Sequence, residues 1–178
     1  SLGLNTDEAG WGTAEYLVSH PYLMVDTSLF EMEFKAKLLR EIEDLDGQTD
    51  GVIIHSDNFQ ALNLMQDKYL NQIQMVYIDP PYNTNASEIV YKNGYKHSSW
   101  LSMVYDRVDL SRKLLTDSGV VSVAIDDFEG AKLQLSLDEI LGFENRLGSV
   151  TVVHNPGGRH DDKFIATAHE YNFFYAKY

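Results

Sequence analysis

Hydrophobic positions along the chain alternate between unbroken apolar runs, typical of buried strands, and spacings of three and four residues, typical of amphipathic helices. Apolar runs bounded by polar or turn residues predict strands at 51–55, 75–78, 120–125, 150–153 and 171–175. Helical spacing predicts helices at 28–45, around 61–65, at 98–116 and at 128–141. The chain therefore alternates strand and helix over most of its length.

The order of these elements predicts an α/β fold. Strands that alternate with helices form a mostly parallel sheet whose right-handed crossovers cover both faces. The last two strands, 150–153 and 171–175, have no helix between them, which predicts an antiparallel hairpin at one edge. We expect an extended N-terminal arm over 1–27 and a single catalytic-type domain over 28–178.

The first predicted helix, 28–45, carries signals for both of its ends. Ser28 and Glu31 have the spacing of a capping box, in which each side chain bonds the backbone of the other. Residues 47–50, which begin with Gly47, are expected to end the helix.

The strand at 75–78 runs into Asp79, Pro80, Pro81 and Tyr82. Proline has no backbone N–H, so the strand must stop there and the loop offers only hydrogen-bond acceptors: the Asp79 carboxylate and the carbonyls of Asp79 and Pro80. Such a loop suits a ligand that brings two N–H donors on one nitrogen. Tyr82 could stack on a flat heterocycle, an interaction of roughly 1–3 kcal/mol for a base. The alternative is structural: the acid is a turn residue and the tyrosine belongs to the core.

Two further acids follow predicted strands. Asp57 comes after the run at 51–55, where open α/β sheets place a group that reads a ribose hydroxyl or an adenine amino group. The alternative, which the spacing favours, is that Asp57 only caps the following helix. Asp126 follows the strand at 120–125 and is interpreted as structural or cleft-lining. If these strands are parallel, Asp57, Asp79 and Asp126 should face one cleft.

Composition narrows the classes of function. With 178 residues and 44% hydrophobic content, the chain can bury a sizeable core. It has no cysteine, which excludes disulfides and thiol chemistry, and no run of about 18 apolar residues, so we expect a cytoplasmic protein without a membrane partner. The net charge of −13 argues against a grip on nucleic acid by this segment alone. The histidines and acids lack the spacing of a metal site, so no metal is expected.

The stretch Asp79-Pro80-Pro81-Tyr82-Asn83-Thr84 resembles the catalytic motif of amino-group DNA methyltransferases that modify adenine N6. Several flanking segments resemble the modification (Mod) subunit of type III restriction-modification systems: residues 25–27, 50–62, 100–103 with Arg107, 123–127 and 169–171. Together these segments cover about residues 20–178.

This resemblance implies a Rossmann-like methyltransferase fold with S-adenosyl-L-methionine as methyl donor. Asp79 and the Pro80 carbonyl would accept the two N6–H donors of an adenine flipped out of double-stranded DNA, and Tyr82 would stack on that base. Asp57, with Phe59 as a weaker candidate, would approach the adenine of the cofactor. The resemblance also implies a restriction subunit as partner and a homodimer.

One part of the family pattern is missing. The glycine-rich cofactor loop is absent, because Asn155-Pro156-Gly157-Gly158 lacks both the spacing and the preceding acid. We therefore expect the chain to be the amino-terminal catalytic half of a longer enzyme, inactive alone. The alternatives are methylation of another amino group, such as cytosine N4, an RNA base or a glutamine amide, and a non-catalytic assembly module.

Overall fold

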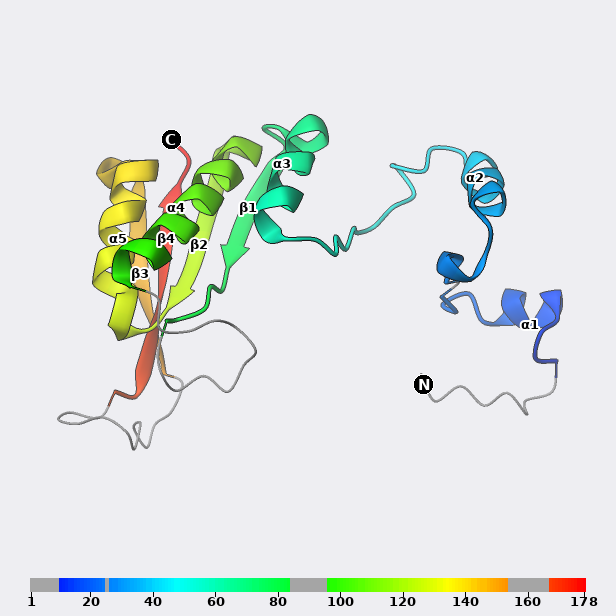
Figure 1. The fold of residues 1–178 in the computed structure, drawn as a ribbon, viewed down its shortest axis with the longest axis horizontal. Coiled ribbons are helices and arrows are strands. Elements are labelled where there is room, and N and C mark those ends of the chain that lie inside the picture. The colour runs from blue at the N-terminus through cyan, green and yellow to red at the C-terminus, as the bar shows by residue number, and fades with distance from the viewer. Residues whose placement is uncertain (1–9, 25, 84–95, 154–166) are drawn as a thin grey trace. The chain divides into compact units, whose positions relative to one another are not determined.

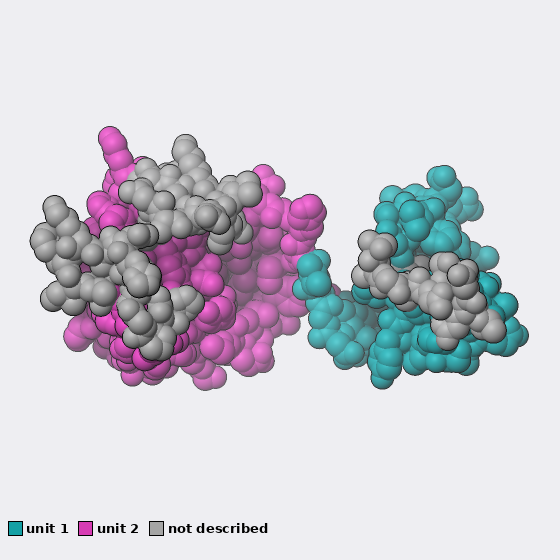
Figure 2. Space-filling model, turned by 90° about the horizontal axis from the view of Figure 1, so that it is seen from below, with its two compact units in different colours: residues 1–53 teal, residues 54–178 magenta. Residues whose placement is uncertain are grey.

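The structure is a computed structural model that describes residues 10–24, 26–83, 96–153 and 167–178. The chain divides into two compact units, Ser1–Ile53 and Ile54–Tyr178, which are coloured separately in Figure 2. The arm over 1–27 and the domain over 28–178 stay a prediction about how the protein is organised.

In its described residues, 10–24 and 26–53, the first unit contains only short helices: α1 (Ala14–Ser19), the 3₁₀ helix η1 (Thr27–Leu29) and α2 (Met32–Arg40). The single long helix predicted at 28–45 is therefore wrong. Asp26 accepts a hydrogen bond from the Ser28 amide and starts η1, so that α2 begins only after Glu31, which makes no side-chain capping bond. Further along, Asp44 adopts a positive φ of 48°, which is incompatible with a continuing helix.

The second unit forms the sheet and its helices (Figure 1). Its elements are α3 (Asn58–Tyr69), β1 (Ile73–Ile78), α4 (His97–Leu114), β2 (Leu115–Ile125), α5 (Asp127–Leu141), η2 (Phe143–Asn145), β3 (Arg146–Val153) and β4 (His169–Ala176). The helices expected around 61–65, at 98–116 and at 128–141 are confirmed, as are the four strands from 75 onward. β2 begins earlier than expected because Leu115 already pairs with Ile73 of β1.

The sheet has four strands in the order β1-β2-β4-β3. β1 and β2 are parallel, whereas β4 runs antiparallel to both β2 and β3. The α/β class and the antiparallel edge hairpin are thus confirmed. Because Ile125 near the end of β2 pairs with Tyr171, the carboxyl ends of the parallel strands lie beside the start of β4.

The strand predicted at 51–55 is absent. These residues are irregular and exposed, and Ile53 is 99% exposed. An apolar run forms a strand only where a neighbour satisfies its backbone hydrogen bonds, and within the described sheet β1 pairs with β2 alone. The described sheet therefore contains one parallel pair, β1 with β2.

The core lies on one face of the sheet. Val121, Val123 and Phe173 of the central strands pack against buried side chains of α4 and α5, and Figure 1 shows both helices over the same side. Helices were expected on both faces, but the apolar stripes of α4 and α5 both meet this one face. On the other face, Met75 and Tyr77 of β1 are 52% and 59% exposed. None of the described helices is long and apolar enough to cross a membrane.

Candidate active site

β1 ends at Ile78, and Asp79 follows at the carboxyl edge of the sheet. The strand stops there for the reason that the sequence suggests, since Pro80 and Pro81 lack the N–H groups needed to continue the ladder. Asp79 is exposed, whereas Pro80 is buried. The structure therefore presents the carboxylate to solvent at the end of a strand that is packed in the sheet.

Tyr82 is half-buried and packs against the hydrophobic core. Its hydroxyl donates a hydrogen bond to Oε2 of Glu170 in β4, at 3.1 Å. Burial raises the pKa of Tyr82 far above its ordinary value, and the negative charges of Asp79 and Glu170 raise it further. The phenol therefore stays protonated and acts as a donor between two carboxylates.

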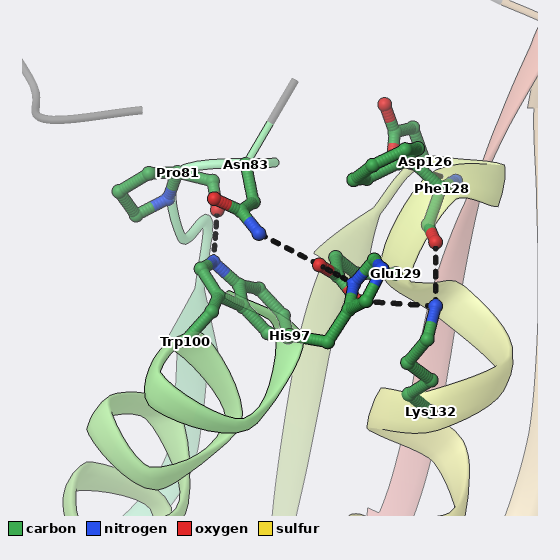
Figure 3. A network of polar contacts seen from close by, with 8 residues as sticks. All are labelled: Pro81, Asn83, His97, Trp100, Asp126, Phe128, Glu129 and Lys132. Atoms are coloured by element: carbon green, nitrogen blue, oxygen red, sulfur yellow. Dashed lines mark hydrogen bonds and ion pairs between the residues drawn. The ribbon is translucent and has the colours of Figure 1, made fainter. Parts of the chain in front are cut away.

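The loop after β1 is fastened to α4 through Trp100. This side chain is fully buried, and its Nε1–H donates to the Pro81 carbonyl at 2.7 Å (Figure 3). The structure places Trp100 in the core. Its indole nitrogen nevertheless fixes the backbone next to Tyr82.

Asn83 fastens the loop at a second point. It has a positive φ of 62°, a conformation that asparagine adopts more readily than most residues. Its Nδ2 donates to Oε1 of Glu129, at 2.7 Å, and the residue is only 4% exposed. The same Oε1 lies 2.6 Å from Nδ1 of His97, and Lys132 Nζ lies 3.4 Å from Oε2 (Figure 3).

Glu129 is a fully buried carboxylate in the first turn of α5. Burial raises its pKa, but the hydrogen bonds from Asn83 and His97 and the charges of Lys132 and His97 outweigh burial and lower the pKa below its usual range. The side chain is therefore ionised at neutral pH, and it joins the loop to the first turns of α4 and α5.

Asp57 lies at the start of α3, and its Oδ1 accepts hydrogen bonds from the amides of Phe59 and Gln60, at 3.0 and 3.3 Å. This is the helix cap that the sequence favoured. Its Oδ2 lies 3.9 Å from Nη2 of Arg107 in α4, and Arg107 also sits over the Phe59 ring at 5.9 Å. Asp57 and Phe59 are both exposed. Their role at a cofactor stays a prediction.

Asp126 at the end of β2 is buried and caps α5, since its Oδ1 accepts a hydrogen bond from the Phe128 amide at 3.1 Å. This agrees with the structural interpretation. Asp79 and Asp126 thus follow neighbouring parallel strands, whereas Asp57 follows an irregular segment.

Sequence reasoning missed the side chains that hold the loop: His97, Glu129 and Glu170, together with the anchoring roles of Asn83 and Trp100. Asn83 gave one signal, because asparagine after Pro-Pro-Tyr is suited to a positive φ. Glu129 gave no such signal, since an acid three residues after the helix cap Asp126 is what the first turn of many helices contains.

Two segments that the sequence analysis used lie outside the described residues. Thr84 of the motif falls within 84–95, and residues 155–158 fall within 154–166. Within the described part of the chain, no group of histidines and acids is arranged to hold a metal ion.

The fold and the acid at the end of β1 define the class: an open α/β sheet of the methyltransferase type. TTHA0409 of Thermus thermophilus, a DNA modification methylase solved in complex with S-adenosyl-L-methionine, aligns with a TM-score of 0.51 at 16% identity, over 68% of this chain and 51% of that one. A family model described as DNA methylase, of the N6/N4 type, matches residues 73–178. The chain belongs to this DNA methylase family.

Curated relatives are considerably longer than this chain. The type II methyltransferase M.KpnI of Klebsiella pneumoniae is 32% identical, over 84% of this chain and 37% of that protein. The EcoPI Mod subunit of Escherichia phage P1, a type III restriction-modification enzyme, is 31% identical, over 72% of this chain and 25% of that protein. The chain thus spans 37% and 25% of the length of these two relatives.

Proposed function

We propose that the chain provides the amine-binding catalytic part of a DNA methyltransferase that methylates adenine N6. The observation that carries this proposal is the exposed Asp79 at the carboxyl end of β1, on a loop that begins with two prolines and is held from both sides. Membership in the N6/N4 DNA methylase family supports it.

The chemistry follows from what the loop offers. The lone pair of adenine N6 is delocalised into the ring, so the amine is a weak nucleophile. Asp79 accepts one N6–H and the Pro80 carbonyl accepts the other, which turns the nitrogen towards tetrahedral geometry and frees its lone pair. The negative charge of Asp79 also stabilises the positive charge that develops on nitrogen as the methyl arrives, and the proton leaves afterwards.

Tyr82 holds the base in this proposal. An amino group inside a stacked duplex cannot be reached, so the adenine must be flipped out and received by an aromatic side chain. The hydrogen bond from Tyr82 to Glu170 fixes the ring beside Asp79 before any base arrives. Pro81 contributes by its rigid backbone, since its carbonyl is already held by Trp100.

S-adenosyl-L-methionine is the proposed methyl donor, and when bound it supplies an electrophilic methyl group. Asp57 and Phe59 fit a role in holding it, because both are exposed and the Asp57 cap uses Oδ1, leaving Oδ2 directed near Arg107. The solved relative TTHA0409 was obtained with this cofactor. The family's glycine-rich loop is missing from the sequence, so Asp57 and Phe59 would form only part of the site.

The short span of the chain relative to M.KpnI and EcoPI Mod supports a place within a longer enzyme. Other parts of that enzyme would complete the cofactor site and read the DNA, which agrees with the net charge of −13 here. Type III relatives also support a restriction-modification role, with a restriction subunit and a second copy of the enzyme as partners.

Cytosine N4 is the second candidate acceptor, since the family comprises both N6 and N4 methylases. An RNA base, a glutamine amide and a purely structural role are the remaining alternatives. An acid before Pro-Pro favours adenine within this group.

Transfer of a labelled methyl from S-adenosyl-L-methionine to double-stranded DNA, followed by analysis of the bases, tests the proposal in the complete enzyme that carries this chain. We expect label on adenine N6, lost in Asp79→Ala and retained in Asp67→Ala, an exposed acid of α3. Label on cytosine would move the acceptor to N4. Label that persists in Asp79→Ala would remove the proposed role of this carboxylate.

A further inference from the structure

The loop of residues 79–83 is tied by side chains from several distant elements. Trp100 of α4 holds the Pro81 carbonyl, and Glu129 of α5 holds the Asn83 amide, so the fastened positions flank Tyr82 on both sides. Glu170 of β4 holds Tyr82 itself. The exposed Asp79 lies two residues before the first of these fastened positions.

Glu129 has an unusual position among these residues. Its side chain is fully buried, and within the described residues Oε2 makes no hydrogen bond, although Lys132 Nζ lies 3.4 Å away. Burying an ionised carboxylate is costly, and a packed apolar residue of similar size is often at least as stable. A carboxylate at this place is therefore poorly explained by stability alone.

The geometry around Oε1 indicates another role. This one oxygen contacts Asn83 of the loop at 2.7 Å and His97 at the start of α4 at 2.6 Å. Figure 3 shows both side chains converging on Glu129 from one side and Lys132 approaching from the other. The carboxylate thus fixes the loop relative to α4 and α5 at once. It does so at Asn83, the loop residue with a positive φ.

We propose that Glu129 is a positioning residue, which acts through Asn83 to hold the loop of residues 79–83 in the geometry needed for methyl transfer. This inference rests on the proposed function and deepens it. Glu129 touches neither substrate nor cofactor in this account. It determines the positions of the Asp79 and Tyr82 side chains, and misplacing a catalytic group by about 1 Å can cost roughly 100-fold in rate.

The Trp100 indole proton reports on the loop without any assay of activity. In the complete enzyme, the indole N–H signal of Trp100 is identified in a proton–nitrogen NMR spectrum as the one that Trp100→Phe removes. Glu129→Gln should speed hydrogen exchange of that proton at least about tenfold, because the Pro81 carbonyl is then less firmly held. Glu139→Gln, at an exposed position of the same helix, should leave the rate unchanged.

The amides of β2 are followed in the same samples, because they separate loosening of the loop from loss of the fold. Faster exchange at Trp100 with unchanged exchange at Val123 supports the positioning role. An unchanged rate at Trp100 overturns it, as does a rise that is equal at Trp100 and Val123.

A double-mutant cycle on methyl transfer in the complete enzyme tests the route through Asn83. Asn83→Gly removes the amide while glycine keeps access to the positive φ. Each of Glu129→Leu and Asn83→Gly should lower kcat roughly 10- to 100-fold with little change in the KM for S-adenosyl-L-methionine. The double variant should lose no more than the worse single variant, because both changes remove the hydrogen bond from Asn83 to residue 129.

Losses that multiply in the double variant would show that Glu129 does not act through Asn83 and would overturn this inference. A wild-type enzyme without methyl transfer would instead overturn the proposed function. The Trp100 exchange rate still decides the positioning role in that case, so the two failures are distinguishable.

Discussion

The two ends of the sheet use buried polar side chains in opposite ways. At the end where β1 and β2 begin, Lys177 is 4% exposed, and its Nζ donates to Asn71 Oδ1 at 2.7 Å and to the Leu115 carbonyl at 2.8 Å. At the other end, Glu129 is fully buried and holds Asn83, which ends the loop that begins with the exposed Asp79. Both ends bury a charge beside an exposed acid, but Lys177 pairs directly with its acid, Asp117, at 3.6 Å, whereas Glu129 holds the loop that carries Asp79.

This difference separates stability from function. Lys177 joins the end of β4 to the beginnings of β1 and β2, so its contacts only hold elements of the fold together. The contacts of Glu129 and Trp100 end in the loop that carries the exposed Asp79. Changes at the first end should act on unfolding alone, whereas changes at the second should act on methyl transfer more than on unfolding.

Removing the Lys177 ammonium should have the largest effect on stability. Lys177→Met leaves the Asn71 side chain and the Leu115 carbonyl without their donor, which should cost about 3 kcal/mol in the free energy of unfolding. Urea denaturation followed by circular dichroism measures this. Lys113→Met, at an exposed lysine paired with Asp109, should change the value by at most about 0.5 kcal/mol. Equal effects of the two variants would contradict the role given to Lys177.

Trp100→Phe should have the next largest effect, and it belongs to the other end of the sheet. The variant loses buried volume and the donor to the Pro81 carbonyl, which should cost about 2 kcal/mol of stability. At a temperature where the variant stays folded, its rate of methyl transfer should still fall, and by more than the small decrease in folded protein accounts for. Trp11→Phe, at a partly exposed site in the first unit, is the matched control. Full activity in folded Trp100→Phe would show that the loop needs no such anchor.

Asp57 gives a smaller expected effect, and two substitutions there distinguish its role as a helix cap from a role in cofactor binding. Asp57→Ala removes the cap of α3 and should cost about 1 kcal/mol of stability, whereas Asp57→Asn should keep the cap. Both variants should weaken binding of S-adenosyl-L-methionine, measured by calorimetry with the complete enzyme. Unaltered binding in Asp57→Asn would leave Asp57 as a cap only.

The smallest effect is the pH dependence that Glu129 contributes. Its folded-state pKa lies below the ordinary value of 4.5, so between these two values the unfolded chain binds more protons than the folded one. The contribution of Glu129 to stability is therefore present above pH 4.5 and is lost as the pH falls through the folded-state pKa. Unfolding measured from pH 6 to pH 3 should show a shallower slope for Glu129→Gln than for Glu139→Gln. Identical slopes would contradict the lowered pKa.

The sequence predicted those parts of the fold that depend on local pattern. Helical spacing located α4 and α5, and the two prolines located the end of β1, at Ile78, just before Asp79. The run at 51–55 failed as a strand because pairing depends on a neighbour that pattern alone cannot supply. The helix predicted at 28–45 failed because Asp26 starts a separate turn and Asp44 takes a positive φ.

The candidate site was predictable only in part, for a related reason. Asp79 and Tyr82 belong to a contiguous motif, so their residue types already indicate their chemistry. Glu129 and Glu170 reach the loop from positions far away in the chain, and such contacts depend on the strand order β1-β2-β4. Without that order, Glu129 is one acid among many on an acidic chain.

The central claim is that a solvent-facing carboxylate at the end of β1 acts on an amine and does little for the fold. The most direct test measures the single-turnover rate of methyl transfer and the free energy of unfolding for Asp79→Asn in the complete enzyme. We predict a rate lowered by roughly 1,000-fold and a stability within about 0.5 kcal/mol of wild type. A rate close to that of wild type, or a loss of activity that follows a loss of folded protein, would contradict the account.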